Sequence, residues 1–319
     1  MEIGVLGTGA KGRNHVRVYS AMKKVDSVRV YDLNRAVSRE VAERTGAIAC
    51  DSAEDLLRRV DAVSICVPAP YRHIAAEAAL EHGTHMLLER PACQTAREAL
   101  QLAEAVPDGL VAGVGQVERF NPIVAEIKRI VRHPLYVEAK RHNPASPRGM
   151  GSAVVDDLMI HDVDVMTHLF PGIRPRVSSS GTPEVCSALM SYGDVPVYLS
   201  ASRKSSRKIR SLYVEEEDLT IEGDYMSQEV TIYRRPDAYE SVDERYVQEN
   251  VTERVLVNRV EPLNLELSTF VDCVREGRPF PVTLEEAAAN LEVCRRISSC
   301  FATDRVRMYS PAAASVARG

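Results

Sequence analysis

The residues best suited to chemistry lie in two short segments, one at the N-terminus and one in the second half of the chain. The first is the glycine loop GTGAKG at residues 7–12, which follows an apolar run. The second contains Asp157 and His161, four positions apart. A glycine loop of this spacing can hold a dinucleotide, and a histidine beside a carboxylate on one helix face can move a proton. Together, the two segments predict an enzyme that transfers a hydride.

The glycine loop has the surroundings that a dinucleotide site needs. It follows a predicted strand at residues 2–6, opens a helix, and is matched by Asp32 at the end of the next predicted strand. The first glycine permits a tight turn, the second lets a pyrophosphate approach backbone N–H groups, and the third lets helix and strand pack closely. We therefore expect the cofactor to contact Gly7, Gly9, Ala10, Lys11 and Gly12.

Asp32 bears on which dinucleotide the site prefers. Its carboxylate can accept hydrogen bonds from the adenosine ribose hydroxyls and repels a 2′-phosphate, so NAD is favoured. Arg35, three residues later, offers a cation to such a phosphate, although an arginine at a helix start is commonly just solvated. We expect NAD as the cofactor, with NADP as the alternative.

The second segment supplies the proton chemistry. Histidine has an unperturbed pKa near 6.5, so His161 suits a group that accepts and donates a proton at neutral pH, with Asp157 orienting it. Met159 and Ile160, between them, are typical of core contacts. For that reason we expect no metal, although further aspartates crowd the segment at positions 156, 162 and 164.

Further candidates are predicted at the same rim of the sheet. Glu89-Arg90-Pro91 ends a predicted strand, where a charged pair is unusual unless a site uses it. Pro68 and His73 follow the preceding strand. We expect Pro68, His73 and Glu89 to contact the cofactor, and Arg90 to act in catalysis. The alternatives are a salt-bridged loop at residue 89 and an ordinary helix start after residue 68.

Substrate contacts are expected from two places. Arg119 and Asn121 follow the last predicted parallel strand, and a basic run at residues 203–210 includes Lys204 and Arg207. Some of these side chains would bind the phosphates of a nucleotide-linked substrate. The alternative for the basic run is a solvated hairpin.

The order of predicted elements places these residues on a two-domain chain. Strands and helices alternate over roughly the first 115 residues, which predicts a doubly wound parallel sheet with ligands at the carboxyl ends of its strands. Later alternating segments predict a large, mostly antiparallel sheet with one face covered by helices. We expect a Rossmann domain at residues 1–118, an α/β domain for substrate binding and oligomerisation at residues 119–319, and a frayed tail from Pro311.

Composition excludes several classes of partner. The 319 residues carry a net charge of -5 with acids and bases interspersed, which argues against nucleic acid or an anionic membrane as the main partner. No apolar run approaches the roughly 20 residues of a membrane helix, and the N-terminus lacks a signal-peptide pattern. Seven scattered cysteines indicate reduced thiols, with Cys66 and Cys93 as small core residues. We expect a cytoplasmic protein.

In this order, the motifs resemble the glucose-fructose oxidoreductase and inositol dehydrogenase (Gfo/Idh/MocA) family over nearly the whole chain. The resemblance implies an NAD-binding Rossmann domain and an α/β domain whose open sheet commonly mediates homodimers or homotetramers. Within the family, one branch oxidises the 3-hydroxyl of UDP-N-acetylglucosamine to a ketone. The segments that resemble that branch are residues 114–122, 157–164, 207–210 and 261–263.

One position departs from the family pattern. By resemblance, the family has a Glu-Lys-Pro turn whose lysine lies near the nicotinamide ribose and the reacting carbon, whereas this chain has Arg90. A lysine can be tuned to relay a proton, but an arginine stays charged. Arg90 would then stabilise the developing alkoxide while His161 carries the proton transfer. Two alternatives stay open: a dehydrogenase of a free sugar or inositol, and a dinucleotide-binding regulator that has lost turnover.

Overall fold

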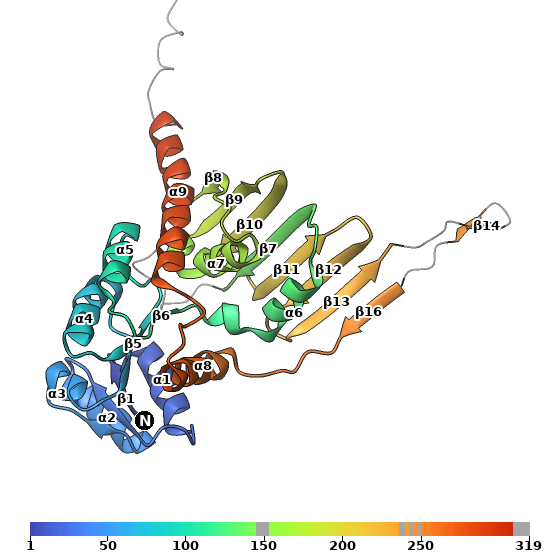
Figure 1. Ribbon diagram of the computed structural model, residues 1–319. Coiled ribbons are helices and arrows are strands. Elements are labelled where there is room, and N and C mark those ends of the chain that lie inside the picture. The colour runs from blue at the N-terminus through green and yellow to red at the C-terminus, as the bar shows by residue number, and fades with distance from the viewer. Residues whose placement is uncertain (145–152, 236–239, 243–244, 248–250, 309–319) are drawn as a thin grey trace, which may run out of the picture. The chain divides into compact units, whose positions relative to one another are not determined.

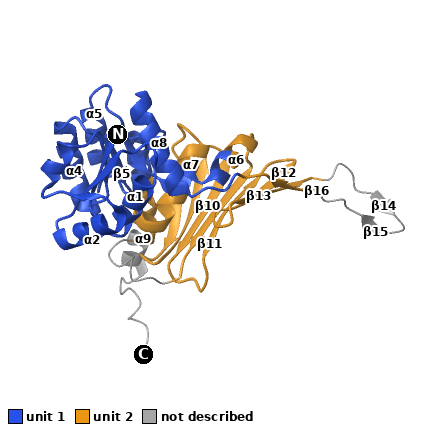
Figure 2. Cartoon of the chain, turned by 90° about the horizontal axis from the view of Figure 1, so that it is seen from below, with its two compact units in different colours: residues 1–125, 258–292 blue, residues 126–257, 293–319 orange. Residues whose placement is uncertain are grey.

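The chain divides into two compact units (Figure 2). Unit 1 comprises Met1–Ala125 and Asn258–Glu292, and unit 2 comprises Glu126–Val257 and Val293–Gly319. The computed structural model describes residues 1–144, 153–235, 240–242, 245–247 and 251–308. The tail predicted from Pro311 lies outside the described residues.

Unit 1 is built on a six-stranded parallel sheet, which confirms the predicted doubly wound fold. The strand order is β3-β2-β1-β4-β5-β6. The first strands are added on one side of β1 and the later strands on the other, so the order switches between β1 and β4, and ligands bind at such a switch point. The strands are β1 (Glu2–Leu6), β2 (Ser27–Tyr31), β3 (Ile48–Ala49), β4 (Ala62–Ile65), β5 (His85–Glu89) and β6 (Ala112–Gly115). The helices are α1 (Ala10–Ser20), α2 (Arg35–Thr45), α3 (Ala53–Leu57), α4 (Ala69–Glu81), α5 (Ala96–Ala105), the short 3₁₀ segment η1 (Val117–Phe120) and α8 (Pro262–Glu276).

Apolar strands and well-capped helices explain why this unit folds as it does. All four residues of β4 are buried, as expected for a strand covered on both faces of a parallel sheet. Helix α5 begins at a capping box, in which the Thr95 hydroxyl accepts from the Glu98 N–H and the Glu98 carboxylate accepts from the Thr95 N–H. Helix α2 ends at Gly46, whose φ of +74° favours glycine. Such helix ends return the chain to the sheet for the next strand. Because the strands are parallel, their carboxyl ends all lie at the same edge of the sheet.

Helix α8 belongs to unit 1 although it lies far along the sequence. The ring of Phe280, just after α8, packs 5.5 Å from the Phe120 ring and 6.0 Å from the Phe270 ring between centroids. Gly113 makes room for it, since a Cβ at that position would lie 2.3 Å from the Phe280 ring. The observed division therefore differs from the one expected at residue 118: unit 1 extends to residue 125 and includes the returning segment 258–292, because this apolar packing completes its core.

Unit 2 is built on an eight-stranded sheet in the order β16-β13-β12-β11-β7-β10-β9-β8. Neighbouring strands are antiparallel except β7 and β10, which run parallel, so the predicted mostly antiparallel sheet is confirmed. The strands are β7 (Tyr136–His142), β8 (Arg176–Gly181), β9 (Val185–Tyr192), β10 (Val195–Ser202), β11 (Ile209–Glu215), β12 (Leu219–Asp224), β13 (Glu229–Arg234) and β16 (Val251–Val255), with β14 (Glu240–Val242) and β15 (Arg245–Val247) as a separate pair. The helices are α6 (Pro122–Ile130), the π-helical turn η3 (Val155–Met159), α7 (Ile160–Leu169) and α9 (Leu284–Met308); α6 and α9 each run from one unit into the other.

One face of the large sheet is covered by helices. Helices α6 and α7 lie against that face (Figure 1), and burial alternates strictly along β7. On the opposite face, the strand register places Tyr136, Leu189 and Tyr233 in exposed or half-buried positions. This alternation is what a sheet with a single buried face requires.

The connection from β10 to β11 is not a hairpin, which corrects one interpretation of the basic run. Strands β10 and β11 pair with β7 from opposite sides, so residues 203–208 cross the end of β7. A hairpin would have required direct pairing of the two strands.

Two further expectations concern the cysteines and the possibility of a membrane-spanning helix. Cys93 is buried, as expected, whereas Cys66 is only half-buried because it lies at the glycine loop, where a Cβ on Gly12 would come within 3.4 Å of the Cys66 Cβ. The cysteines at positions 50, 66, 93, 186, 273 and 294 are free thiols. Among the described helices, none has the length and apolarity needed to cross a membrane.

Candidate cofactor and proton-transfer sites

The glycine loop at the end of β1 has the geometry of an anion-binding turn. Gly7 has a φ of +87°, and a Cβ there would lie 2.8 Å from the Val67 nitrogen. A Cβ on Gly12 would lie 1.8 Å from the Gly7 carbonyl oxygen, so the close packing of α1 requires glycine. A Cβ on Gly9 would meet no described atom within 4 Å. Gly9 is the N-cap of α1 and leaves the first N–H groups of the helix open, which suits a pyrophosphate.

Asp32 lies beside this loop, at the end of β2. Its Oδ2 accepts from the Thr8 N–H at 2.7 Å, and its Oδ1 accepts from the Asn34 N–H at 2.9 Å. These bonds hold the carboxylate at the edge where a dinucleotide places its adenosine ribose. Arg35 turns toward the start of α3, where its Nη2 donates to the Asp51 carbonyl at 3.0 Å.

Glu89, at the end of β5, is the centre of a charged cluster that also contains Lys11 and His15. The Oε1 atom of the buried Glu89 lies 3.1 Å from His15 Nε2 and 3.7 Å from Lys11 Nζ, and Oε2 accepts from the Arg90 N–H at 3.1 Å. Burial alone would raise the pKa of Glu89, but Lys11 and His15 outweigh burial and hold that pKa well below its ordinary value. The structure thus brings together two residues expected near the cofactor, Lys11 and Glu89.

His15 was not identified from the sequence. Burial lowers the pKa of His15, but Cys66 and Glu89 more than offset burial and raise that pKa to about 10. The imidazole is therefore cationic at neutral pH and neutralises the buried carboxylate. Its position four residues after Lys11, on the same helix face, was the signal that could have found it.

Arg72 links the ends of β4 and β5, and it too was missed. Its Nε donates to the Val67 carbonyl at 2.9 Å, and its Nη1 donates to the Pro91 carbonyl. The Arg90-Pro91 peptide bond is cis. This buried guanidinium ties the turn that carries Arg90 to the loop that carries the candidate Pro68.

The two candidates after β4 differ in their surroundings. Pro68 is the N-cap of α4 and lies at the strand-end rim, as expected. His73 lies one turn into α4, where its Nε2 is 3.2 Å from the Glu77 carboxylate. The helix start thus presents the Pro68 backbone to the rim and pairs His73 along the helix.

In unit 2, Asp157 lies on the π-helical turn η3 and His161 in the first turn of α7. His161 is buried, with 6% of its surface exposed, while the Asp157 side chain is 35% exposed. The Asp157 Oδ2 lies 3.7 Å from Arg203 Nη1, and the Arg203 Nη2 also donates to Glu184 Oε1 at 3.0 Å. One member of the predicted basic run is therefore a buried partner of the candidate site residue Asp157.

Asp162 occupies the core of unit 2. Its carboxylate accepts from Nε and Nη2 of Arg141, with a shortest distance of 2.8 Å, and both side chains are almost fully buried. The Arg141 guanidinium also lies 5.1 Å from the centre of the Tyr225 ring. Asp162 therefore anchors α7 to β7. Across the described residues, no group of three or more His, Cys, Asp or Glu side chains is arranged to hold a metal.

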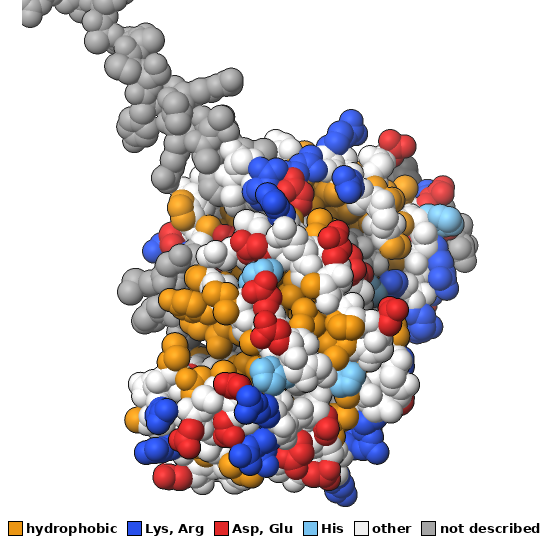
Figure 3. All heavy atoms as spheres, turned by 60° about the vertical axis from the view of Figure 1, so that its left-hand side comes forward, with side chains coloured by type: hydrophobic (Ala, Val, Ile, Leu, Met, Phe, Trp, Pro, Cys, Tyr) orange, Lys and Arg blue, Asp and Glu red, His pale blue; other side chains and the backbone are white. Residues whose placement is uncertain are grey.

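The four expected substrate contacts fall into two kinds. Arg119 and Asn121 are buried in unit 1, where Arg119 Nη1 donates to Glu286 Oε2 at 3.2 Å and Asn121 Nδ2 donates to Glu118 Oε2 at 3.4 Å. Lys204 and Arg207 are exposed on the connection between β10 and β11. On the face shown in Figure 3, basic and acidic side chains are interspersed.

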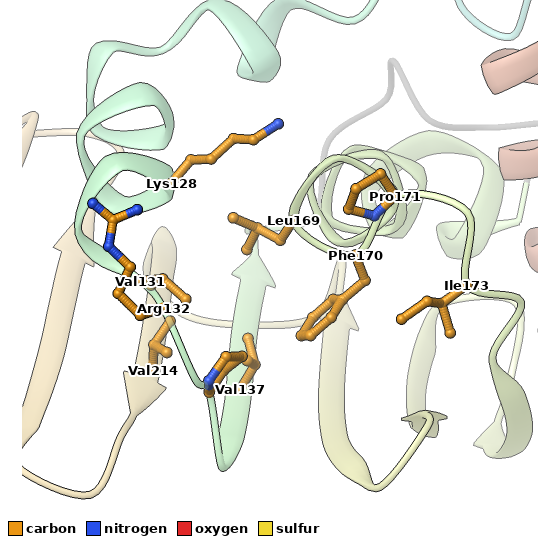
Figure 4. A pocket seen from close by; sticks show the side chains of 10 residues that line it. Lys128, Val131, Arg132, Val137, Leu169, Phe170, Pro171, Ile173 and Val214 are labelled. Carbon is orange, nitrogen blue, oxygen red and sulfur yellow. The ribbon is translucent and has the colours of Figure 1, made fainter.

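A cavity of about 330 Å³ lies in unit 2, between the ends of α6 and α7 and the sheet (Figure 4). Its walls are largely apolar and include Val137, Phe170 and Val214, with Lys128 and Arg132 at the α6 side. Lys128 Nζ lies 3.2 Å from His168 Nε2. The candidate site residues predicted from the sequence do not line this cavity.

Comparison with known proteins gives a consistent result. The family described as "Oxidoreductase family, NAD-binding Rossmann fold" (Gfo/Idh/MocA) matches residues 1–114. UDP-N-acetylglucosamine 3-dehydrogenase of Acidithiobacillus ferrooxidans is 32% identical over 245 residues, which are 74% of this chain and 77% of that protein. Inositol 2-dehydrogenase of Rhodococcus erythropolis is 34% identical over 205 residues, which are 56% of this chain and 57% of that protein.

Solved structures agree in fold. The Acidithiobacillus ferrooxidans UDP-N-acetylglucosamine 3-dehydrogenase superposes with a TM-score of 0.86 at 27% identity, covering 95% of this chain and 98% of the other. A levoglucosan dehydrogenase in complex with NADH and levoglucosan gives a TM-score of 0.80 at 18% identity, covering 95% and 97%, and this likeness concerns the fold alone.

Proposed function

Because the chain belongs to the Gfo/Idh/MocA family of NAD-binding oxidoreductases, we propose that it oxidises a ring hydroxyl of a sugar, namely the 3-hydroxyl of UDP-N-acetylglucosamine, with NAD as cofactor. The observation that carries this proposal is the pairing of an open glycine loop beside Asp32 with a buried histidine one helical turn from Asp157. The first is suited to a dinucleotide, and the second to a proton leaving a hydroxyl group.

Each catalytic candidate has a role that follows from its surroundings. His161 takes the hydroxyl proton, and Asp157, held by Arg203, orients the imidazole. Arg90, at the end of β5, stabilises the negative charge that develops on the oxygen. The nicotinamide ring, when bound, accepts the hydride. Buried Asp162 holds the start of α7 and thereby keeps His161 in place.

The preference for NAD over NADP rests on Asp32. Its two oxygens are already oriented by Thr8 and Asn34, so a 2′-phosphate would meet a fixed negative charge. The exposed Arg35 donates to the Asp51 carbonyl, which favours an ordinary surface arginine at the helix start over an arginine that binds a phosphate. We therefore propose NAD as the working cofactor.

The nucleotide-sugar substrate is supported by two observations. The relative named UDP-N-acetylglucosamine 3-dehydrogenase matches three quarters of this chain. In addition, Lys204 and Arg207 are exposed cations at one end of the sheet in unit 2, available to a diphosphate. Arg119 and Asn121 act in this proposal by holding the segment after β6, since both are buried.

A free sugar or inositol is the second candidate substrate, favoured by the 34% identity to an inositol 2-dehydrogenase. The two candidates differ in what they require of the basic connection. Replacing Lys204 and Arg207 by Ala should raise the KM for UDP-sugars about tenfold if these cations bind a diphosphate. An unchanged KM for UDP-sugars would favour the free-sugar candidate.

We further propose that the protein works as a homodimer or homotetramer through the uncovered face of the large sheet. That face presents Leu189, 54% exposed, and Tyr233, 40% exposed, beside other aromatic side chains. Sedimentation of the wild type and of a variant with Leu189→Glu and Tyr233→Glu tests this, since a sheet-to-sheet assembly should dissociate in the variant.

Formation of NADH, followed at 340 nm, tests the proposed reaction. NAD or NADP is offered with UDP-N-acetylglucosamine, UDP-glucose, glucose and myo-inositol to the wild type, His161→Ala and Arg90→Lys. Turnover of a UDP-sugar that is lost in His161→Ala supports the proposal. A silent wild type with activity in Arg90→Lys would instead favour a dinucleotide-binding regulator, because only the arginine would then disarm the site.

A further inference from the structure

Glu266, in the middle of α8, is a fully buried carboxyl group in unit 1. Its Oε1 lies where a side chain on Gly115 would be crowded, 3.2 Å from the position of a Cβ on that glycine. Its Oε2 is buried without a hydrogen-bond partner among the described residues. Gly115 ends β6, next to Glu89 in the register of β5 and β6. The carboxyl therefore lies beneath the strand-end rim that carries the charged cluster.

The charged and titratable groups that act on Glu266 come from two elements, while η1, which also packs against α8, carries Glu118 and Arg119, bonded to Asn121 and Glu286. Helix α1 contributes Lys11, His15 and the buried Tyr19, and the end of β5 contributes Glu89 and Arg90. His15 and Glu89 are ionised and neutralise each other. Lys11, the third member of the charged cluster, adds a further cation. With Glu266 protonated, the cluster of Lys11, His15 and Glu89 is therefore net positive; with Glu266 ionised, this region of unit 1 loses one unit of positive charge.

Glu266 changes charge within an ordinary range of pH. Burial and then the neighbouring Glu89 carboxylate raise its pKa to about 8, although His15, Lys11 and Arg90 pull it down. The carboxyl is thus neutral at pH 7 and mostly ionised at pH 9. His15, with a pKa of about 10, stays largely cationic over the same interval.

The cluster lies toward the nicotinamide end of the expected cofactor position. Asp32 marks the adenosine end, on the β2 side of the glycine loop, whereas Lys11 turns from the same loop toward β5 on the other side. A dinucleotide that crosses the switch point has its nicotinamide on that second side. The oxidised nicotinamide ring carries a positive charge and the reduced ring carries none, so a net charge nearby distinguishes the two.

We propose that Glu266 sets which oxidation state of the cofactor this chain prefers: while its carboxyl is neutral the cationic cluster favours NADH over NAD, and when it ionises the preference moves toward NAD. This inference rests on the proposed use of a nicotinamide dinucleotide. Glu266 is a positioning residue in this scheme, because it acts through the charge of the cluster. At neutral pH the chain accordingly holds the reduced cofactor more tightly.

Calorimetric titration of NAD and of NADH at pH 7.0, 8.0 and 9.0 tests the inference without turnover. In the wild type, the ratio of the Kd for NAD to the Kd for NADH should fall about three- to tenfold from pH 7 to pH 9, as expected for one added charge at several ångströms. In Glu266→Gln the ratio should stay at its pH 7.0 value. Glu285→Gln, an exposed glutamate at the start of α9, should behave as the wild type.

A second variant removes a cation instead of the carboxyl, at Lys11, whose side chain is half-exposed. Lys11→Met should lower the ratio about three- to tenfold at every pH, because one positive charge is lost. A wild-type ratio independent of pH, an unchanged pH dependence in Glu266→Gln, or an unchanged ratio in Lys11→Met would each overturn the inference. Failure to bind either form of the cofactor would instead count against the proposed function.

Discussion

The two units hold their candidate site residues by different means. In unit 1 the backbone does most of the positioning: the φ of Gly7 and the contact of Gly12 with the Gly7 carbonyl place the start of α1, and Lys11 and His15 follow from that helix. In unit 2, Arg141 on β7 and Arg203 just after β10 hold the segment that contains Asp157 and His161. The candidate site in unit 1 should therefore be disrupted when a glycine is replaced by a larger residue. The candidate site in unit 2 should be disrupted when a long charged side chain is replaced by one that cannot make the same contact.

His161→Ala should have the largest effect of the changes considered. Loss of a positioned general base should lower kcat by about 100- to 10,000-fold while the Kd for NADH stays unchanged, because the cofactor candidates lie in unit 1. His168→Ala, on the same helix and half-buried beside Lys128, is the matched control and should keep activity. Full turnover in His161→Ala would remove it from the reaction.

Gly12→Ala and Gly9→Ala separate packing from ligand approach within one loop. Gly12→Ala should lower the free energy of unfolding by about 1–3 kcal/mol, because its Cβ would collide with backbone. Gly9→Ala should change that free energy by less than about 0.5 kcal/mol, since its Cβ meets no described atom, but should weaken cofactor binding. Urea denaturation and calorimetric titration measure the two effects. Equal loss of stability in both variants would contradict the contrast.

The His15–Glu89 pair predicts a pH dependence of stability in unit 1. The pKa of His15 rises from its ordinary 6.5 to about 10 on folding, so its contribution is fully present below pH 6.5 and is lost as pH rises toward 10. The pKa of Glu89 is lowered, so its contribution is present above the ordinary glutamate value and is lost as pH falls below it.

His15→Gln should therefore be less stable than the wild type at pH 6.5, by about 1–3 kcal/mol, with the difference shrinking toward pH 10. Thermal unfolding at a series of pH values measures this. A difference that is constant with pH would show that His15 is neutral in the folded protein.

Arg203→Met tests the side-chain positioning in unit 2. We expect about 1–2 kcal/mol lower stability, discounted for the partial exposure of Asp157 and Glu184, and a lower kcat because Asp157 loses its partner. Lys204→Met, at the next position with 61% of its side chain exposed, should leave stability within about 0.5 kcal/mol. If both variants lose the same kcat, the basic connection acts as a whole and not through Arg203.

Asp32→Ser should have the smallest effect on turnover and the clearest effect on choice of cofactor. Removing the fixed carboxylate should raise the affinity for NADP relative to NAD about tenfold, since a 2′-phosphate would no longer meet a negative charge. The ratio of kcat/KM values for the two cofactors measures it. An unchanged ratio would mean that another group sets the preference.

The parts that could be predicted from sequence are those governed by local rules. The doubly wound sheet followed from alternating apolar strands and helices, and the glycine loop followed from its spacing together with the strand before it and the helix after it. The large antiparallel sheet followed from period-two burial, seen along β7. These signals lie within short windows of the chain.

The parts that could not be predicted depend on residues far apart in sequence. Glu266 meets the cluster on β5 only because α8 returns to unit 1, and Arg203 meets Asp157 only through the three-dimensional path of β10. The crossing of β7 by residues 203–208 likewise depends on strand order, which spacing does not encode. Pairing across such distances has no periodic signature.

The discontinuity of unit 1 also has a consequence for the order of events during synthesis. The Phe280 ring packs against Phe120 and fills the space beside Gly113, and neither contact can form until the ribosome has made residues 262–280. The strands of unit 2, at residues 136–255, emerge before that happens. The unit translated first therefore completes its core only after the strands of unit 2 have been made, which departs from the usual expectation that an N-terminal domain finishes folding before the next one is synthesised.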